Sequence, residues 1–163
     1  MYLNLVVFRY YHWLVYASLI KAHYERKGEK VLFVTRRGSI KALTKSGLKH
    51  GEDFMAFGEV AKWLAKKPDI AINVIMHHHP SSVAEWGFVV PEGERDVSIS
   101  FYADGYTNRL MGDAEIAGFL ERIPAVKHRE VFFVPVMQRH KVPHLKNFKR
   151  IVMPFSDLKA VFD

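Results

Sequence analysis

The sequence predicts an α/β protein with a mostly parallel sheet and helices on both faces. Short runs of consecutive apolar, β-branched residues recur along the chain, as is typical of strands that are buried on both faces. Between them lie segments whose apolar residues are spaced three and four apart, which is typical of helices. This alternation is characteristic of βαβ units with right-handed crossovers.

The apolar runs predict a sheet of five to six strands. The strands are expected at residues 3–8, 31–35, 70–76, 97–102, 131–136 and 150–153. Pro135 has no backbone N–H to donate to a sheet, so it is expected to shorten the fifth strand at its end.

Helices are expected between these strands. The first carries a stripe formed by Trp13, Tyr16, Ala17, Ile20 and Tyr24, and Gly28 ends it. Ser39 is placed to cap a second helix that Gly47 closes. The remaining helices are expected at 57–67, from Ser81 to Trp86, from a capping Asp113 to Pro124, and from Ser156. The whole pattern is that of a doubly wound, Rossmann-like sheet.

Length and composition fit one globular domain. The 163 residues, 49% of them hydrophobic and 25% charged, predict a single Rossmann-like domain over 1–163 and argue against disorder. The chain has no cysteine, which excludes disulfides, thiolate metal sites and cysteine nucleophiles. We find no signal peptide and no apolar stretch of the ~20 residues that a membrane span needs, so a cytoplasmic protein is expected.

The net charge of +7 favours anionic partners such as nucleic acid, acidic lipid, nucleotides or acidic glycans. The basic residues are dispersed in small groups, which fits a solvated basic surface equally well.

Ligands of such sheets bind at the carboxyl ends of the strands, which directs attention to the loops there. Asp104 and Gly105 follow the strand at 97–102. A carboxylate at a strand end can act as a general base that removes a proton from a hydroxyl group. The same Asp-Gly pair also suits an ordinary turn in which the side chain bonds its own backbone.

Three histidines end the strand at 70–76. Because neighbouring residues of a strand alternate sides, His77 and His79 are expected on one side and His78 on the other. They are suited to contact a phosphate or carboxylate, to act as an acid, or simply to pack against aromatic rings. A zinc site would need further ligands such as His12 or His23, and no spacing indicates one, so no metal is predicted.

Two further loops contain arginine. Arg36 precedes a predicted helix and suits either an anion clamp or an exposed basic turn. Arg9, Tyr10 and His12 follow the first strand in a bulky loop without glycine, which disfavours a dinucleotide pyrophosphate and suits a sugar ring. Alternatively, Tyr10 and Trp13 begin the buried face of the following helix.

The segment 99–106 (ISFYADGY) resembles the strand and acidic motif, two Asp/Glu residues followed by Gly, of bacterial sialyltransferases and polysialyltransferases, which have the two-domain GT-B fold. The resemblance implies that Asp104 is the general base on the acceptor hydroxyl, with Gly105 and Tyr106 beside it in the substrate site. The first acidic position is Ala103 here. The segment 72–79, followed by two serines, also resembles a histidine-bearing segment that precedes the motif in some of these enzymes.

The resemblance implies transfer of a sialyl or related sugar from CMP-sugar or another nucleotide sugar to a glycan acceptor, with no resident cofactor. The substrate is then expected to contact Arg9, Tyr10, His12, Arg36, His77, His78 and His79. The family's His-Pro motif for the CMP phosphate follows the acidic motif, whereas His79-Pro80 precedes it, so that role is not transferred. A GT-B enzyme needs a second, nucleotide-binding domain, so this chain is expected either to be the N-terminal, acceptor-binding half of a longer enzyme or to work with a partner.

Two other functions compete with this interpretation. A non-catalytic module for anions or nucleic acid would use the basic charge and stacking by Tyr10, Tyr11 and Tyr106. A metal-dependent hydrolase would use the three histidines.

Overall fold

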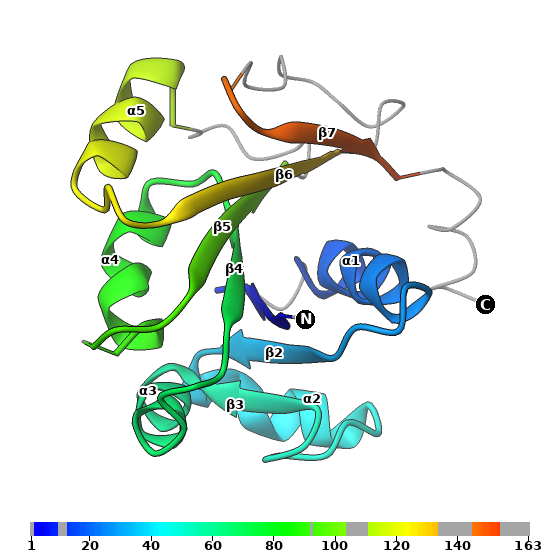
Figure 1. Cartoon of the computed structure of the whole chain (residues 1–163). Coiled ribbons are helices and arrows are strands. Elements are labelled where there is room, and N and C mark those ends of the chain that lie inside the picture. The colour runs from blue at the N-terminus through cyan, green and yellow to red at the C-terminus, as the bar shows by residue number, and fades with distance from the viewer. Residues whose placement is uncertain (1, 10–12, 92, 104–110, 134–144, 154–163) are drawn as a thin grey trace.

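The computed structural model of the chain describes residues 2–9, 13–91, 93–103, 111–133 and 145–153 (Figure 1). Over these residues the chain forms one parallel sheet of seven strands in the order β3-β2-β1-β4-β5-β6-β7. The strands are β1 (Leu3–Val7), β2 (Val31–Thr35), β3 (Phe54–Ala56), β4 (Ile72–His77), β5 (Val97–Tyr102), β6 (Lys127–Phe133) and β7 (Lys149–Val152). The helices are α1 (Leu14–Glu25), α2 (Ile40–Lys45) after a 3-10 turn (Arg37–Ser39), α3 (Phe57–Ala65), α4 (Ser81–Val89) and α5 (Asp113–Glu121).

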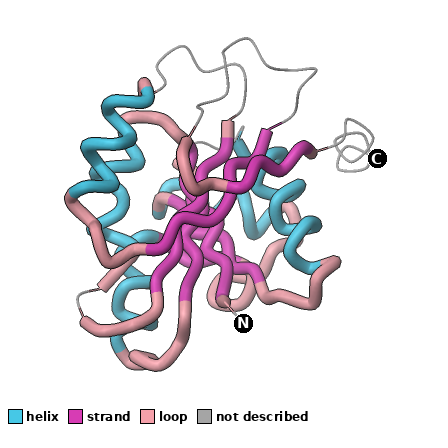
Figure 2. Tube along the Cα trace, turned by 45° about the horizontal axis from the view of Figure 1, so that its top comes forward, coloured by secondary structure: helices cyan, strands magenta, loops and turns pink. Residues whose placement is uncertain are grey.

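Helices cover both faces of the sheet, as Figure 2 shows for the strands in magenta between helices in cyan. Residues of α1 and α2 pack in one apolar cluster with alternate residues of the strands, including Val6 and Ile75. Residues of α3, α4 and α5 pack on the opposite face in a second cluster that includes Leu5 and Val74. The division follows from right-handed crossovers, because the strand order runs outward from β1 to β3 and then reverses toward β7.

The predicted α/β class and doubly wound architecture are confirmed, and the sheet has one strand more than expected. The additional strand is β3, whose three residues pair with Phe33, Val34 and Thr35 of β2. The sequence pattern does not indicate β3, because an apolar run of three residues cannot be told from the start of helix α3, which follows it directly. Strand β6 begins at Lys127, earlier than expected. The apolar pattern did not include its first residues because they are polar and partly exposed.

Other predicted boundaries shift by a few residues. Gly28 and Gly47 follow α1 and α2 with φ of 76° and 94°, the left-handed conformation that glycine adopts most readily. Asp113 is the first residue of α5, and Gly112 occupies the cap position assigned to it. Pro135 and the helix expected from Ser156 lie outside the described residues.

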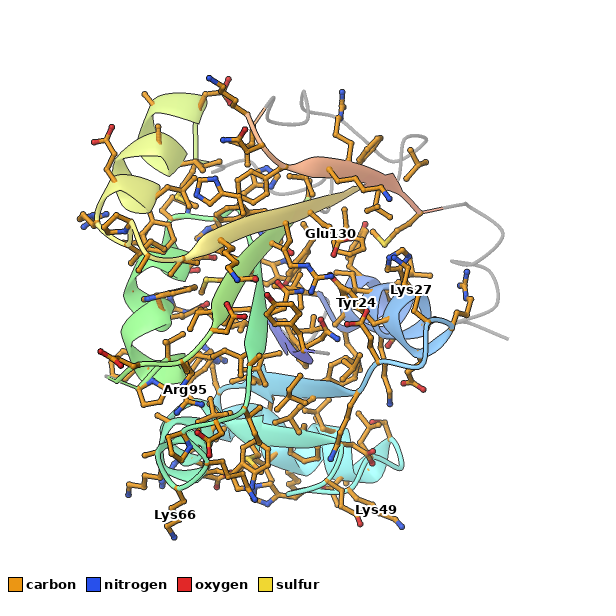
Figure 3. The ribbon with its side chains drawn as sticks, viewed as in Figure 1. Tyr24, Lys27, Lys49, Lys66, Arg95 and Glu130 are labelled. Carbon is orange, nitrogen blue, oxygen red and sulfur yellow. The ribbon has the colours of Figure 1, made fainter. Side chains whose placement is uncertain are left out.

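A buried polar network crosses the face of the sheet that α1 covers. Tyr24 of α1 and Glu130 of β6 point toward one another, and the Tyr24 hydroxyl donates to Glu130 Oε1 at 2.6 Å (Figure 3). The Asn73 amide donates to the Tyr24 hydroxyl at 3.0 Å and to Asn4 Oδ1 at 3.1 Å, and the Ser100 hydroxyl donates to Asn73 Oδ1 at 3.1 Å. Burial and the nearby Glu130 carboxylate raise the pKa of Tyr24 above its usual range, which keeps its hydroxyl protonated.

No helix among the described residues is both long and apolar enough to cross a membrane.

Candidate functional site

The reversal of strand order between β1 and β4 defines where a ligand site is expected. The chain leaves these two adjacent strands toward opposite faces of the sheet, and doubly wound proteins bind ligands at the carboxyl ends of the strands at such a point. Strand β1 ends at Val7, whose register partner in β4 is Met76. The next residue, His77, pairs in register with Tyr102, the last residue of β5.

Three rings pack together at this edge. The indole of Trp13, which precedes α1, lies parallel to the imidazole of His77 with ring centroids 4.1 Å and planes 8° apart. The ring of Tyr102 meets the same imidazole edge-on at 5.0 Å. Trp13 is 1% exposed, so it belongs to the buried face of the α1 layer, one of the two alternatives left open for it. The rings of Trp13, His77 and Tyr102 form an aromatic cluster next to the loop that follows β4.

The three histidines gather in one place instead of alternating sides. The His78 ring lies 5.5 Å from the His77 ring with planes 19° apart, and the His79 ring lies 6.3 Å from it. The expectation that His78 faces the opposite side is therefore wrong. Strand β4 ends at His77, so the alternation of side chains does not continue beyond it.

Hydrogen bonds fix the protonation of two of these rings. Nδ1 of His78 lies 3.1 Å from the carbonyl oxygen of Tyr102, which can only accept, so this nitrogen carries a proton. Nδ1 of His79 accepts the backbone N–H of Ser81 at 3.1 Å, so it carries the lone pair. A neutral His79 therefore has its proton on Nε2.

Helix α4 begins directly after this loop and holds it in place. The Ser81 hydroxyl lies 2.9 Å from Nδ1 of His79, and the Ser82 hydroxyl donates to the carbonyl oxygen of His77. Both serines are buried. The short helix predicted from Ser81 is confirmed and continues to Val89.

Glu85, one helical turn after Ser81, is a buried carboxyl group that the sequence analysis did not single out. It is 6% exposed, and its Oε1 has no hydrogen-bond partner among the described residues. Burial raises its pKa to about 7, against the opposing effects of the Arg9 guanidinium, the Ser81 hydroxyl and the Arg36 guanidinium. A carboxylate within a predicted helix is ordinarily exposed, so no sequence pattern indicated that this one is buried.

The predicted site residues that the structure describes fall into two groups. His77, His78 and His79 lie together at the end of β4, while Arg9 and Arg36 follow β1 and β2 and act electrostatically on Glu85. Arg36 is exposed, and α2 behind it has only six residues. The other predicted site residues, Tyr10, His12, Asp104, Gly105 and Tyr106, lie outside the described residues.

The residue that precedes Asp104 is Ala103, directly after the end of β5. Ala103 is buried, and its backbone N–H donates to the carbonyl oxygen of Phe132 at 3.0 Å.

Within the ranges that the structure describes, no group of three or more histidine and acidic side chains is arranged to hold a metal ion.

The strand order, with its switch point between β1 and β4, and the helices on both faces define a doubly wound α/β protein with a Rossmann-like fold. A scan against protein-family models finds no match, and searches of curated proteins and of solved structures find no significant match.

Proposed function

We propose that this chain is the acceptor-binding domain of a glycosyltransferase that transfers a sialyl or related sugar from a nucleotide sugar to a hydroxyl group. In this proposal the histidine loop after β4 holds an anionic group of the sugar. Asp104 removes the proton of the attacking hydroxyl. A second, nucleotide-binding domain, on this chain or on a partner, supplies the donor site.

One observation carries the proposal. The two segments that resemble sialyltransferases, 72–79 and 99–106, include adjacent parallel strands, and His77 of one is the register partner of Tyr102 of the other. The histidines and the residue two positions before Asp104 therefore lie at the same edge of the sheet, beside the switch point where doubly wound proteins bind ligands.

The local chemistry supports an anionic sugar as the ligand. A neutral His79 has its proton on Nε2, and protonation of the ring adds a positive charge that attracts anions. Arg9 follows the neighbouring strand β1 and adds a guanidinium group, which binds carboxylates and phosphates at two points.

Transfer and binding assays test the proposal together. The protein is incubated with CMP-sialic acid and galactoside acceptors, and products are identified by mass spectrometry. Acceptor binding is followed by saturation-transfer NMR. We expect acceptor binding by the wild type and by Asp104→Asn, and any transfer to be lost in Asp104→Asn, because the amide cannot accept the proton.

Two results would contradict this function. Equal transfer by the wild type and Asp104→Asn removes Asp104 from the mechanism. If the protein shows neither transfer nor acceptor binding, the proposed glycosyltransferase function is wrong. The competing module for anionic polymers predicts instead that the protein binds single-stranded nucleic acid with an affinity that falls steeply as salt rises.

A further inference from the structure

Two adjoining cavities lie at the amino edge of the sheet, opposite the candidate functional site. They have volumes of about 300 and about 330 Å³, and both are lined by Leu3, Lys30 and Trp63. Leu3 begins β1, Lys30 precedes β2, and Asp53, which lines the second cavity, precedes β3. Because these strands run parallel, the three residues lie at the edge where the strands begin. The volumes fall in the range of small-molecule sites, about 300–1,000 Å³.

The cavities reach the apolar core. Leu3, Leu32 and Met55 are at most 8% exposed and belong to the apolar cluster under α3. Trp63 of α3 packs against this cluster and stays partly exposed. A flat ring in the cavities would contact both the indole and aliphatic side chains, which is how proteins commonly hold aromatic ligands.

The first cavity, of about 300 Å³, is lined by two lysines. These are Lys30 and Lys67, and Nζ of Lys67 lies 5.3 Å from the centroid of the Trp63 ring. Neither lysine forms an ion pair with an acidic residue that the structure describes. Both are exposed, so an anion can reach them. Two ammonium groups beside an indole suit a phosphate that is attached to an aromatic ligand.

The second cavity adds hydrogen-bond acceptors. Glu52 and Asp53 line it. The backbone N–H of Lys49 donates to Asp53 Oδ2 at 2.7 Å, and Nζ of Lys49 lies 3.8 Å from Glu52 Oε2. An ionised carboxylate has about four lone-pair sites, so both groups can accept further hydrogen bonds. This end of the site disfavours an anionic group and favours N–H or O–H donors.

We propose that the two cavities form a binding site for a nucleoside monophosphate. The phosphate lies between Lys30 and Lys67, the base contacts Trp63, and N–H or O–H donors of the nucleoside point toward Glu52 and Asp53. A free amino acid fits this order of charges less well, because its ammonium and carboxylate groups are attached to one carbon. The inference goes beyond the proposed transferase, since the site lies at the opposite edge of the sheet.

Nitrogen-15 NMR spectra of the full chain, titrated with AMP, test the site. AMP carries an aromatic base, a phosphate and an exocyclic amine. The indole signal of Trp63 is assigned by its loss in Trp63→Phe. We expect this signal to shift and saturate as AMP is added, while the backbone signals of the histidine loop stay in place. Adenosine, which lacks the phosphate, should bind at least about tenfold more weakly.

Two pairs of lysines provide matched variants. Lys30→Gln and Lys67→Gln each remove a charge that lines the site, and each should weaken AMP binding about threefold or more. The controls are Lys27→Gln and Lys66→Gln, which change lysines outside the described lining of both cavities. Lys66 points away from the protein (Figure 3), and neither control should change the affinity by more than about twofold. All four lysines are exposed, so these variants are expected to fold.

The site is overturned if millimolar AMP leaves the Trp63 indole signal in place. Equal affinities for AMP and adenosine also overturn it, because the phosphate is then not recognised. So does a loss of affinity in Lys66→Gln as large as that in Lys67→Gln, since only the overall positive charge would then matter. AMP that shifts the histidine loop alone binds at the other edge and contradicts the proposal as well. Failure of the transfer assay leaves this site intact, because the titration requires neither donor nor acceptor sugar.

Discussion

The hydroxyl of Tyr102 donates a hydrogen bond to the carbonyl oxygen of Val7 at 2.7 Å. Tyr102 ends β5 and Val7 ends β1, so the bond spans the intervening strand β4. The side chain consequently meets the imidazole of His77 edge-on, and it ties together the three strand ends that surround the candidate site.

We expect Tyr102→Phe to lower the free energy of unfolding by about 1–3 kcal/mol. The change keeps the ring but leaves the buried Val7 carbonyl without this donor, and an unsatisfied buried group costs about that much. Urea denaturation measures the effect. Tyr2→Phe removes an exposed hydroxyl that lies 3.4 Å from Asp96, and it should change stability by less than about 0.5 kcal/mol. Equal effects of the two variants would contradict a structural role for the Tyr102 bond.

Trp13→Ala should destabilise the protein by about 3–5 kcal/mol, because it removes a large, fully buried side chain and leaves a cavity over His77. Thermal or urea denaturation provides the measurement. The control is Phe88→Ala, whose ring is 60% exposed and whose removal should cost little. A loss of less than 1 kcal/mol for Trp13→Ala would show that the indole does not pack on the imidazole.

Glu85 should make the protein less stable as pH rises. The pKa of its carboxyl group is raised from 4.5 to about 7 on folding, so between these values the folded state binds more protons than the unfolded state. The contribution of this group is fully present below about pH 4.5 and is lost as pH rises through about 7, a difference of roughly 3 kcal/mol.

The neutral side chain in Glu85→Gln removes this dependence. Relative to the wild type, we expect the variant to gain stability at pH 8 and to change little at pH 4.5, as measured by urea denaturation at both values. Glu121→Gln, on an exposed carboxylate of α5, supplies the comparison. Parallel stability curves for Glu85→Gln and the wild type would refute the raised pKa.

The sequence predicted the fold because the hydrophobic pattern is strong where burial is complete. Strands β1, β2 and β4 are buried at every residue, so each appears as an unbroken run of mostly apolar side chains. The pattern fails at the edge strand β3 and in the first half of β6. There β3 has three residues and the first half of β6 is polar, and pairing with β2 and β5 decides their conformation more than their own side chains do.

The candidate site was predictable only in part. Strand ends pointed to the histidine loop, because the carboxyl edge of a parallel sheet is where ligands bind. Glu85 was missed because a carboxylate within a predicted helix is ordinarily exposed, and only packing reveals that this one is buried. The grouping of three histidine rings depended on where β4 ends, which no local pattern specifies to a single residue.

The polar chain that runs beneath α1 also bears on how the strands find their alignment. Asn4 and Asn73 are direct partners in the β1–β4 ladder, and Glu130 closes the chain through Tyr24. Aliphatic neighbours such as Val74 and Ile75 are nearly interchangeable, so they tolerate a slipped pairing. If the pairing slipped by one residue, the Asn73 side chain would point into the apolar cluster under α3 and α4. Its amide would then be buried without a hydrogen-bond partner. The network thus makes sheets with a shifted strand register less stable than the native sheet, and hydrophobic packing alone does not provide this selection of the register.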